Sequence, residues 1–128
     1  DLADTEVLRK IELPALGPDW RCGFAEFNRR AGDFAIVQSL AAIELRDGRV
    51  HAARVGVGGA TEVPHRSDAA EGVLQGQAPS AELFALAARA AAESMGELLT
   101  DQQATAEMRR DLVQAMVLRA LEDALAVG

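Results

Sequence analysis

Residues 36–57 read IVQSLAAIELRDGRVHAARVGV, and this stretch decides the fold. Hydrophobic and polar residues alternate on both sides of Asp47-Gly48, a dipeptide type that tolerates the positive φ angles of a two-residue turn. The pattern therefore predicts a β-hairpin. Two apolar side chains from each arm are expected on its buried face: Ile43, Leu45, Val55 and Val57.

Two shorter alternating runs precede the hairpin. Residues 7–13 alternate until Pro14, which ends the run because proline cannot donate to a sheet ladder. Residues 21–28 form the second run. Together with the hairpin, these runs predict a small antiparallel sheet of three to four strands.

The second half of the chain has helical spacing. Ser67-Asp68 begins a first helix that ends near Gly76, and Pro79-Ser80 begins a second that ends near Gly96. A third helix begins at about Thr105 and carries an apolar stripe that includes Leu121. Four of its charged side chains are expected to face mostly outward: Arg109, Arg110, Arg119 and Glu122.

The order of these elements predicts an α+β fold in which three C-terminal helices cover one face of the sheet. Ile43 and Leu121 are then expected in the same core. A length of 128 residues fits a single domain, with a β part over 1–66 and a helical part over 67–128. The chain begins at Asp1 rather than at Met, which indicates a fragment of a longer polypeptide.

Charge and cysteine content exclude several classes of protein. The net charge of -7 disfavours nucleic acid and anionic lipid as partners, because both bind positive surfaces. Cys22 is the only cysteine, so no intramolecular disulfide forms, and a cytoplasmic location is predicted. Such a cysteine is expected to be a small buried hydrophobe. No run of about 20 apolar residues predicts a membrane span.

Common catalytic and metal-binding patterns are missing from the sequence. His51 and His65 lack the spacing and the cysteine partners of a zinc site. Serine never occurs in a Gly-x-Ser-x-Gly elbow. Residues 56–61 superficially resemble a dinucleotide loop, but Thr61 replaces its third glycine and Pro64 follows where a helix should begin. We therefore predict no catalytic or metal-ligating residue.

Residues 24–37, FAEFNRRAGDFAIV, place paired arginines, a glycine, an aspartate and an aromatic ring between two strands. One interpretation is a surface turn in which Asp33 caps local amides and Phe34 plugs the sheet edge. The other is recognition, because Arg29 and Arg30 suit an anion or an interface ion pair and Phe34 suits stacking on a planar ring. These residues alone leave both interpretations open.

Four segments, in matching order, carry a resemblance to a known family. Residues 29–35 resemble the RRxGD(Y/F)A motif of the medium, FAD-binding subunit of carbon monoxide dehydrogenase and related xanthine dehydrogenase-family enzymes. Residues 6–14 resemble the E-I-L-x-x-I-x-I-P strand of that subunit, and residues 58–64 resemble its GG(V/A)…P segment. Residues 107–121 resemble the E-(Y/F)-R-R…R-A-L last helix of its C-terminal domain.

The resemblance implies one domain of a multi-subunit molybdenum hydroxylase. In that family a molybdopterin subunit hydroxylates the organic substrate, 2Fe-2S clusters relay electrons, and FAD passes them to a final acceptor. The main pyrophosphate-binding loops lie in an N-terminal FAD domain of the same subunit. The domain is therefore expected to complete the flavin site, and to be inactive and colourless when isolated.

The resemblance also implies which residues contact the flavin. Leu8 matches a position that meets FAD through its backbone, and Phe34 matches a position whose ring lies against the isoalloxazine. Phe34 also follows a charged Gly-Asp turn, where an aromatic ring has less reason to be in the core than in mid-strand, so it should be at least partly exposed. Glu26 stands where relatives carry a flavin-contacting Lys, a reversal of charge. The candidate cofactor-binding residues are Leu8, Glu26, Arg29, Arg30, Asp33 and Phe34. The alternative function is a non-catalytic assembly module that docks the FAD domain onto partner subunits.

Overall fold

A computed structural model describes residues 2–30 and 32–126. Asp1, at the start of the predicted domain, Ala31, inside the arginine-rich motif, and residues 127–128 lie outside the described chain. Four strands precede three helices: β1 (Trp20–Phe27), β2 (Val37–Arg46), β3 (Arg49–Gly58), β4 (His65–Arg66), α1 (Asp68–Leu74), α2 (Ala81–Ser94) and α3 (Ala106–Ala126).

The strands form one antiparallel sheet in the order β1-β2-β3-β4. The predicted hairpin is confirmed as β2 and β3, and both turn residues have positive φ, +50° at Asp47 and +71° at Gly48. A register shift between Glu44 and Leu45 interrupts the ladder. The predicted inner face of the hairpin is buried at Ile43, Val55 and Val57, and partly buried at Leu45.

Each helix begins behind a hydroxyl side chain that accepts a hydrogen bond from a backbone amide of the first turn. Ser67 Oγ accepts from Ala70 N at 3.3 Å, and Ser80 Oγ accepts from Leu83 N at 3.1 Å. Thr105 Oγ1 accepts from Met108 N at 3.2 Å at the start of α3. The predicted helix starts are therefore confirmed, because capping depends on residues only three positions apart.

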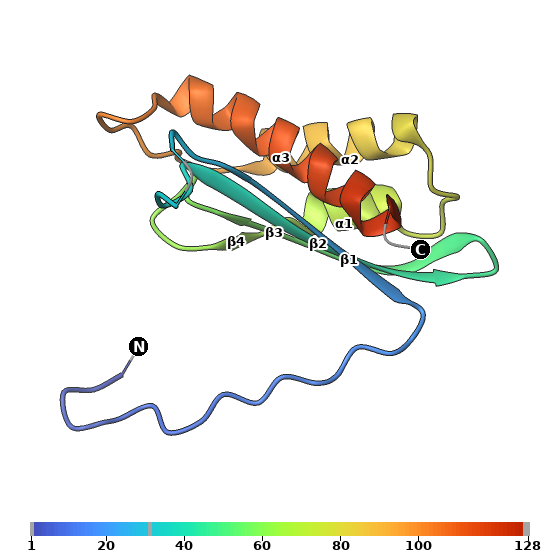
Figure 1. Cartoon of the computed structure of the whole chain (residues 1–128), viewed down its shortest axis with the longest axis horizontal. Coiled ribbons are helices and arrows are strands. Elements are labelled where there is room, and N and C mark those ends of the chain that lie inside the picture. Colours follow the sequence, from blue (N-terminus) through green and yellow to red (C-terminus); the bar gives the residue numbers. More distant parts are fainter. Residues whose placement is uncertain (1, 31, 127–128) are drawn as a thin grey trace.

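All three helices lie on the same face of the sheet (Figure 1). Helix α3 crosses β1 and β2, α2 packs against α3, and α1 packs against α2 and β3. Ile43 of the sheet and Leu121 of α3 belong to one buried hydrophobic cluster. The predicted α+β architecture is confirmed, since one core joins the two halves of the chain.

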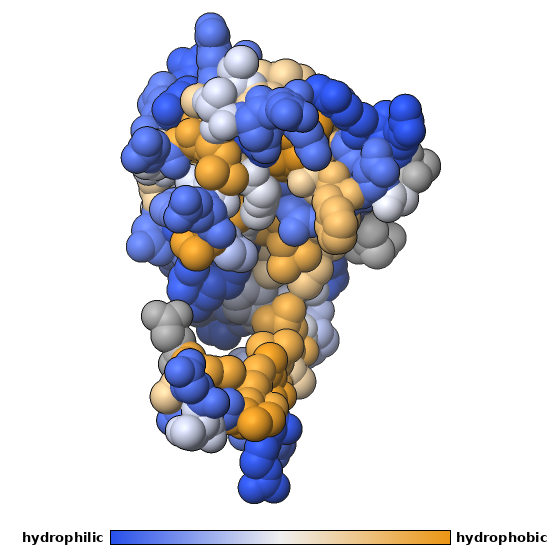
Figure 2. Space-filling view, turned by 90° about the vertical axis from the view of Figure 1, so that its left-hand side faces the viewer, coloured by the Kyte–Doolittle hydropathy of each residue, from blue (hydrophilic) through white to orange (hydrophobic). Residues whose placement is uncertain are grey.

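The strand predicted over residues 7–13 is wrong. This segment is extended but pairs with no strand of the described chain, and it runs along the side of the sheet away from the helices (Figure 1). Val7 is 82% exposed and Leu13 is 84% exposed. Hydrophobic side chains gather over this segment in the lower half of Figure 2. Alternation alone does not make a strand, because a strand needs a partner for its backbone groups.

The face of the sheet away from the helices carries exposed apolar residues. Phe24 of β1 and Leu40 of β2 are paired across the ladder, and both remain about half exposed. Cys22 is also exposed, which corrects the prediction that it is buried, because only the opposite face of β1 meets the helices. Among the described residues, none of the helices combines the length and apolar character that a membrane crossing requires.

Candidate functional site

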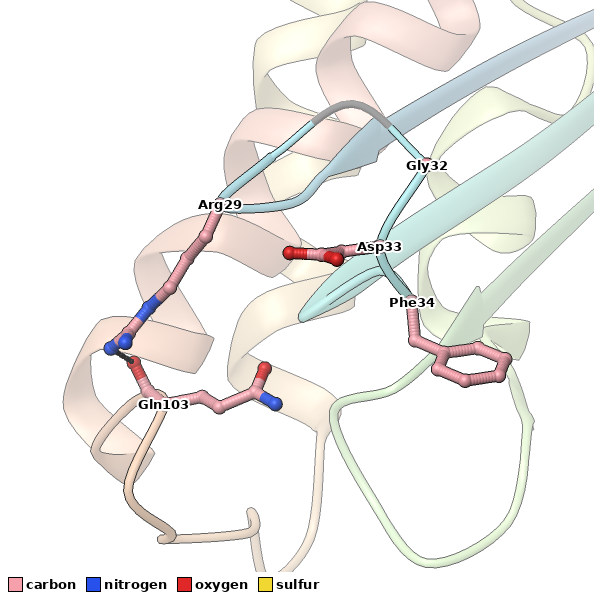
Figure 3. A pocket seen from close by; sticks show the side chains of 5 residues that line it. All are labelled: Arg29, Gly32, Asp33, Phe34 and Gln103. Atoms are coloured by element: carbon pink, nitrogen blue, oxygen red, sulfur yellow. Dashed lines mark hydrogen bonds between the residues drawn. The ribbon is translucent and has the colours of Figure 1, made fainter.

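A pocket opens where the β1–β2 connection meets the loop before α3 (Figure 3). Its volume is about 350 Å³. The lining residues are Arg29, Gly32, Asp33, Phe34 and Gln103. All except Gln103 belong to the β1–β2 connection, so two segments far apart in sequence form the pocket.

Short-range hydrogen bonds shape the β1–β2 connection. Ile36 N donates to Phe27 O at 2.8 Å and closes the base of the loop, and Asp33 N donates to Arg30 O at 3.1 Å within it. Gly32 has a φ of +89°, a left-handed conformation that favours glycine because a β-carbon would clash with the backbone. This local geometry fixes the backbone from which the Asp33 and Phe34 side chains project.

Arg29 forms one wall of the pocket. Its Nη2 donates to Gln103 O at 2.8 Å and to Gln102 O at 3.3 Å. Figure 3 shows the Asp33 carboxylate directed towards Arg29, while the Phe34 ring projects away from Arg29. A planar guanidinium can bridge neighbouring carbonyls in this way, so Arg29 ties the β1–β2 connection to the loop before α3.

Phe34 is the most exposed large hydrophobic residue of the described chain, at 96%. The interpretation in which its ring plugs the sheet edge is therefore wrong. A ring exposed to this degree contributes almost no burial energy to folding, but it offers a complete aromatic face for stacking. The predicted exposure of Phe34 is confirmed.

A buried arginine lies behind the loop that carries Phe34. Arg109 of α3 is 3% exposed, which corrects the prediction that it faces outward. Its Nη1 donates to Ile36 O at 2.7 Å and to Gly59 O at 2.6 Å. Its Nη2 donates to Asp101 Oδ2 at 2.6 Å. Such hydrogen bonds offset part of the cost of burying a guanidinium, and within the described residues Arg109 Nε is buried without a partner.

Asp101 organises the loop that supplies Gln103. Its Oδ1 accepts from Gln103 N at 2.8 Å and from Ala104 N at 3.0 Å. Bonds from the Ala104 and Gln103 amides, followed by the bond to Arg109, hold the pKa of Asp101 below its ordinary value. The carboxylate is therefore ionised at neutral pH and faces the Arg109 cation.

Residues 23–124 match the family model described as the CO dehydrogenase flavoprotein C-terminal domain. The match includes all four strands and three helices apart from the first residues of β1 and the last of α3. The chain belongs to this flavoprotein C-terminal domain family.

Relatives of this flavoprotein C-terminal domain are oxidoreductase subunits. The nicotine 6-hydroxylase medium subunit of Paenarthrobacter nicotinovorans is 32% identical over 96% of this chain and 42% of its own length. A carbon monoxide dehydrogenase chain from Hydrogenophaga pseudoflava aligns with a TM-score of 0.83 at 27% identity, over 89% of this chain and 39% of that one. Quinoline 2-oxidoreductase from Pseudomonas putida 86 aligns at 0.78 and 30% identity, over 85% and 38%. The chain thus spans about two fifths of each relative.

The flavoprotein C-terminal domain brings together only part of the predicted site. Arg29, Asp33 and Phe34 line the pocket, whereas Arg30 is exposed and does not line it. Leu8 lies in the extended N-terminal segment and is 60% exposed. Glu26 is joined to the loop indirectly: Asn28 Nδ2 donates to Glu26 Oε1 at 3.4 Å and to Asp33 O at 3.5 Å, both long bonds.

Sequence reasoning missed Gln103, Asp101 and the burial of Arg109. Nothing local to Gln103 identifies it, because its contact with Arg29 spans more than 70 positions. Arg109 had a usable signal, since it lies four residues before Val113 and therefore on the buried stripe of α3. Within residues 2–30 and 32–126, no cluster of His, Cys, Asp and Glu is suited to a metal ion.

Proposed function

We propose that this domain completes the flavin site of the FAD-carrying subunit of a molybdenum hydroxylase. FAD would receive electrons from 2Fe-2S clusters and pass them to an acceptor, while a molybdopterin subunit oxidises the substrate. The membership of the flavoprotein C-terminal domain family and the similarity to a nicotine 6-hydroxylase medium subunit support this role. The lone cysteine supports a cytoplasmic complex.

The exposed ring of Phe34 carries the proposal. It stands at a pocket that also contains the Asp33 carboxylate and the Arg29 guanidinium. An aromatic face suits stacking on a planar heterocycle such as isoalloxazine, and the neighbouring polar groups suit hydrogen bonds to the edge of that ring. Phe34 would then gain in the complete enzyme the burial that it lacks here.

The size and charge of the pocket fit the edge of a flavin, not a whole dinucleotide. A volume of about 350 Å³ is at the low end for sites that enclose even a drug-sized ligand. Arg29 Nη2 already donates to two backbone carbonyls, which leaves only the Nη1 and Nε donors of this arginine for a pyrophosphate. The phosphates would therefore be bound by the N-terminal FAD domain of the same subunit.

Two other candidate residues depend on the N-terminal FAD domain. Leu8 would present its backbone to FAD once the exposed segment over 2–17 is held by a neighbouring domain. Glu26 would place a carboxylate where relatives place an ammonium group, so it would accept rather than donate hydrogen bonds. Asn28, which bonds Glu26 Oε1, has donors that a flavin oxygen needs.

A second candidate function is assembly of the FAD domain onto its iron–sulfur and molybdopterin partners. The exposed apolar side chains of the N-terminal segment and of the open sheet face favour it, because isolated domains rarely leave so much apolar surface in water. The two functions separate experimentally, since only the first requires Phe34 to contact the cofactor.

Phe34→Ala in the complete subunit tests the proposal. We expect the dissociation constant for FAD to rise about twofold to tenfold, the equivalent of losing one stacking contact. The melting temperature of the apoprotein should change little, because the ring is 96% exposed. Phe34→Tyr should restore FAD binding.

Leu86→Ala is the matched control, because Leu86 is an exposed apolar residue of the helix layer. It should leave FAD affinity unchanged. Unaltered FAD affinity in Phe34→Ala would overturn the flavin-site proposal. If that variant instead failed to assemble with its partner subunits while it kept FAD, the assembly function would be favoured.

A further inference from the structure

We propose that Arg109 is a positioning residue for the flavin contact, because it fixes the backbone of the loop that presents Phe34. This inference rests on the proposed function. It concerns a side chain that lines no part of the pocket and would act on the flavin only through Phe34.

Arg109 joins three segments that are distant in sequence. Ile36, whose carbonyl it binds, is two residues beyond Phe34 and also closes the loop base through the bond from Ile36 N to Phe27 O. Gly59, whose carbonyl it also binds, follows β3. Asp101 belongs to the loop before α3. One buried guanidinium therefore sets how these three segments lie relative to α3.

The backbone packing explains why an arginine occupies this place. Gly59 has a φ of +79°, and a β-carbon there would lie 2.7 Å from Ile36 O. The carbonyls of Ile36 and Gly59 therefore converge closely on the same donor, Arg109 Nη1. The Ile36 bond is buried and the Gly59 bond is partly buried, and an apolar side chain in place of Arg109 would supply neither.

A second route leads from Arg109 to the loop through Asp101. The Asp101 carboxylate binds the amides of Gln103 and Ala104 and so fixes the turn at 101–104. That turn directs the Gln103 carbonyl to Arg29, which lies at the other end of the Phe34 loop. Arg109 thus holds the loop directly at Ile36 and indirectly at Arg29.

Arg110, the next residue of α3, provides a matched control. Its Nη1 donates to Ala92 O at 2.9 Å and connects α3 to α2. Substitution of Arg110 removes an arginine-to-carbonyl bond from the same helix without touching the Phe34 loop. An effect of losing any arginine-to-carbonyl bond from α3 should therefore appear in both variants, whereas loss of loop position should appear in Arg109 variants alone.

The test uses the complete FAD-bound subunit with Arg109→Met, Arg110→Met, Phe34→Ala and the double variant Phe34→Ala/Arg109→Met. Asp101→Asn keeps an oxygen for the amides of residues 103 and 104 but removes the acceptor of Arg109. This variant therefore tests the Arg109 bond even if Arg109→Met folds poorly. Flavin fluorescence gives FAD affinity, and hydrogen exchange by mass spectrometry reports on residues 28–37.

We expect faster exchange over 28–37 and an FAD dissociation constant raised about threefold to tenfold in Arg109→Met and Asp101→Asn, but not in Arg110→Met. In the double variant the affinity should match that of Phe34→Ala alone, because Arg109 acts through Phe34. Additive losses, or equal effects of the Arg109 and Arg110 substitutions, would overturn the inference while leaving the flavin-site proposal intact. If Phe34→Ala itself leaves FAD affinity unchanged, both fail.

Discussion

Gly23 of β1 lies against the backbone of Ala124 in α3, so closely that a β-carbon at Gly23 would be 2.9 Å from Ala124 Cα and closer still to Ala124 N. The neighbouring amide, Phe24 N, donates to Asp123 Oδ2 at 3.0 Å. The last turns of α3 therefore rest directly on the edge strand, with no side chain between the two backbones.

Gly23→Ala should consequently be strongly destabilising. The added methyl group meets backbone atoms of α3, which cannot turn away as a side chain can, so helix and strand must separate. We expect a loss of about 3 kcal/mol or more in the free energy of unfolding, measured by urea denaturation. Gly72→Ala in α1 is the control, because a β-carbon there meets nothing within 4 Å. It should stabilise the protein by about 0.5 to 1 kcal/mol, and an equal loss in both variants would contradict the packing argument.

Glu71 gives the stability of the fold a defined pH dependence. It connects α1 to the sheet by accepting from Val55 N at 3.0 Å and from Arg66 Nε at 2.8 Å. Burial raises the pKa of Glu71, but the bonds from Arg66 and from Val55 N and the charges of Arg66 and Arg54 outweigh it, so the pKa lies below its ordinary value of 4.5.

Because the folded pKa is the lower one, the ionised carboxylate stabilises the fold fully above pH 4.5, and this contribution is lost as the pH falls through the lowered value. Glu71→Gln should cost about 1 to 3 kcal/mol at pH 7. Its difference from the unsubstituted protein should shrink in acid. Thermal melts from pH 7 to pH 3 measure this, with the exposed Glu93→Gln as control. A difference that stays constant with pH would exclude the charge as its cause.

The isolated 128-residue chain should be purified colourless and should bind FAD weakly or not at all. The pocket beside Phe34 is open and holds about 350 Å³, which provides for the edge of a flavin and not for its phosphates. Fluorescence titration with FAD checks this against the complete subunit. Tight, stoichiometric binding by the isolated chain would contradict the division of the site between two domains.

Local sequence alone determined much of the fold. Asp47-Gly48 specified the hairpin because the turn conformation depends on two residues, and Ser67 and Ser80 specified helix starts because a cap acts over three. Phe34 could be predicted to be exposed for the same reason, since it follows a charged Gly-Asp turn that strands seldom accommodate in a core.

Only the tertiary structure decided the features that depend on distant partners. Residues 7–13 alternate as a strand does, but the described chain offers them no neighbour. Arg109 looks like a surface charge until the carbonyls of Ile36 and Gly59 converge on it, and Gln103 joins the pocket only because Arg29 reaches across from the β1–β2 connection. Periodicity and capping act over a few residues, whereas burial and pocket formation depend on segments that meet only after folding. The sequence pattern of a single element therefore does not reveal which residues are buried or which line a pocket.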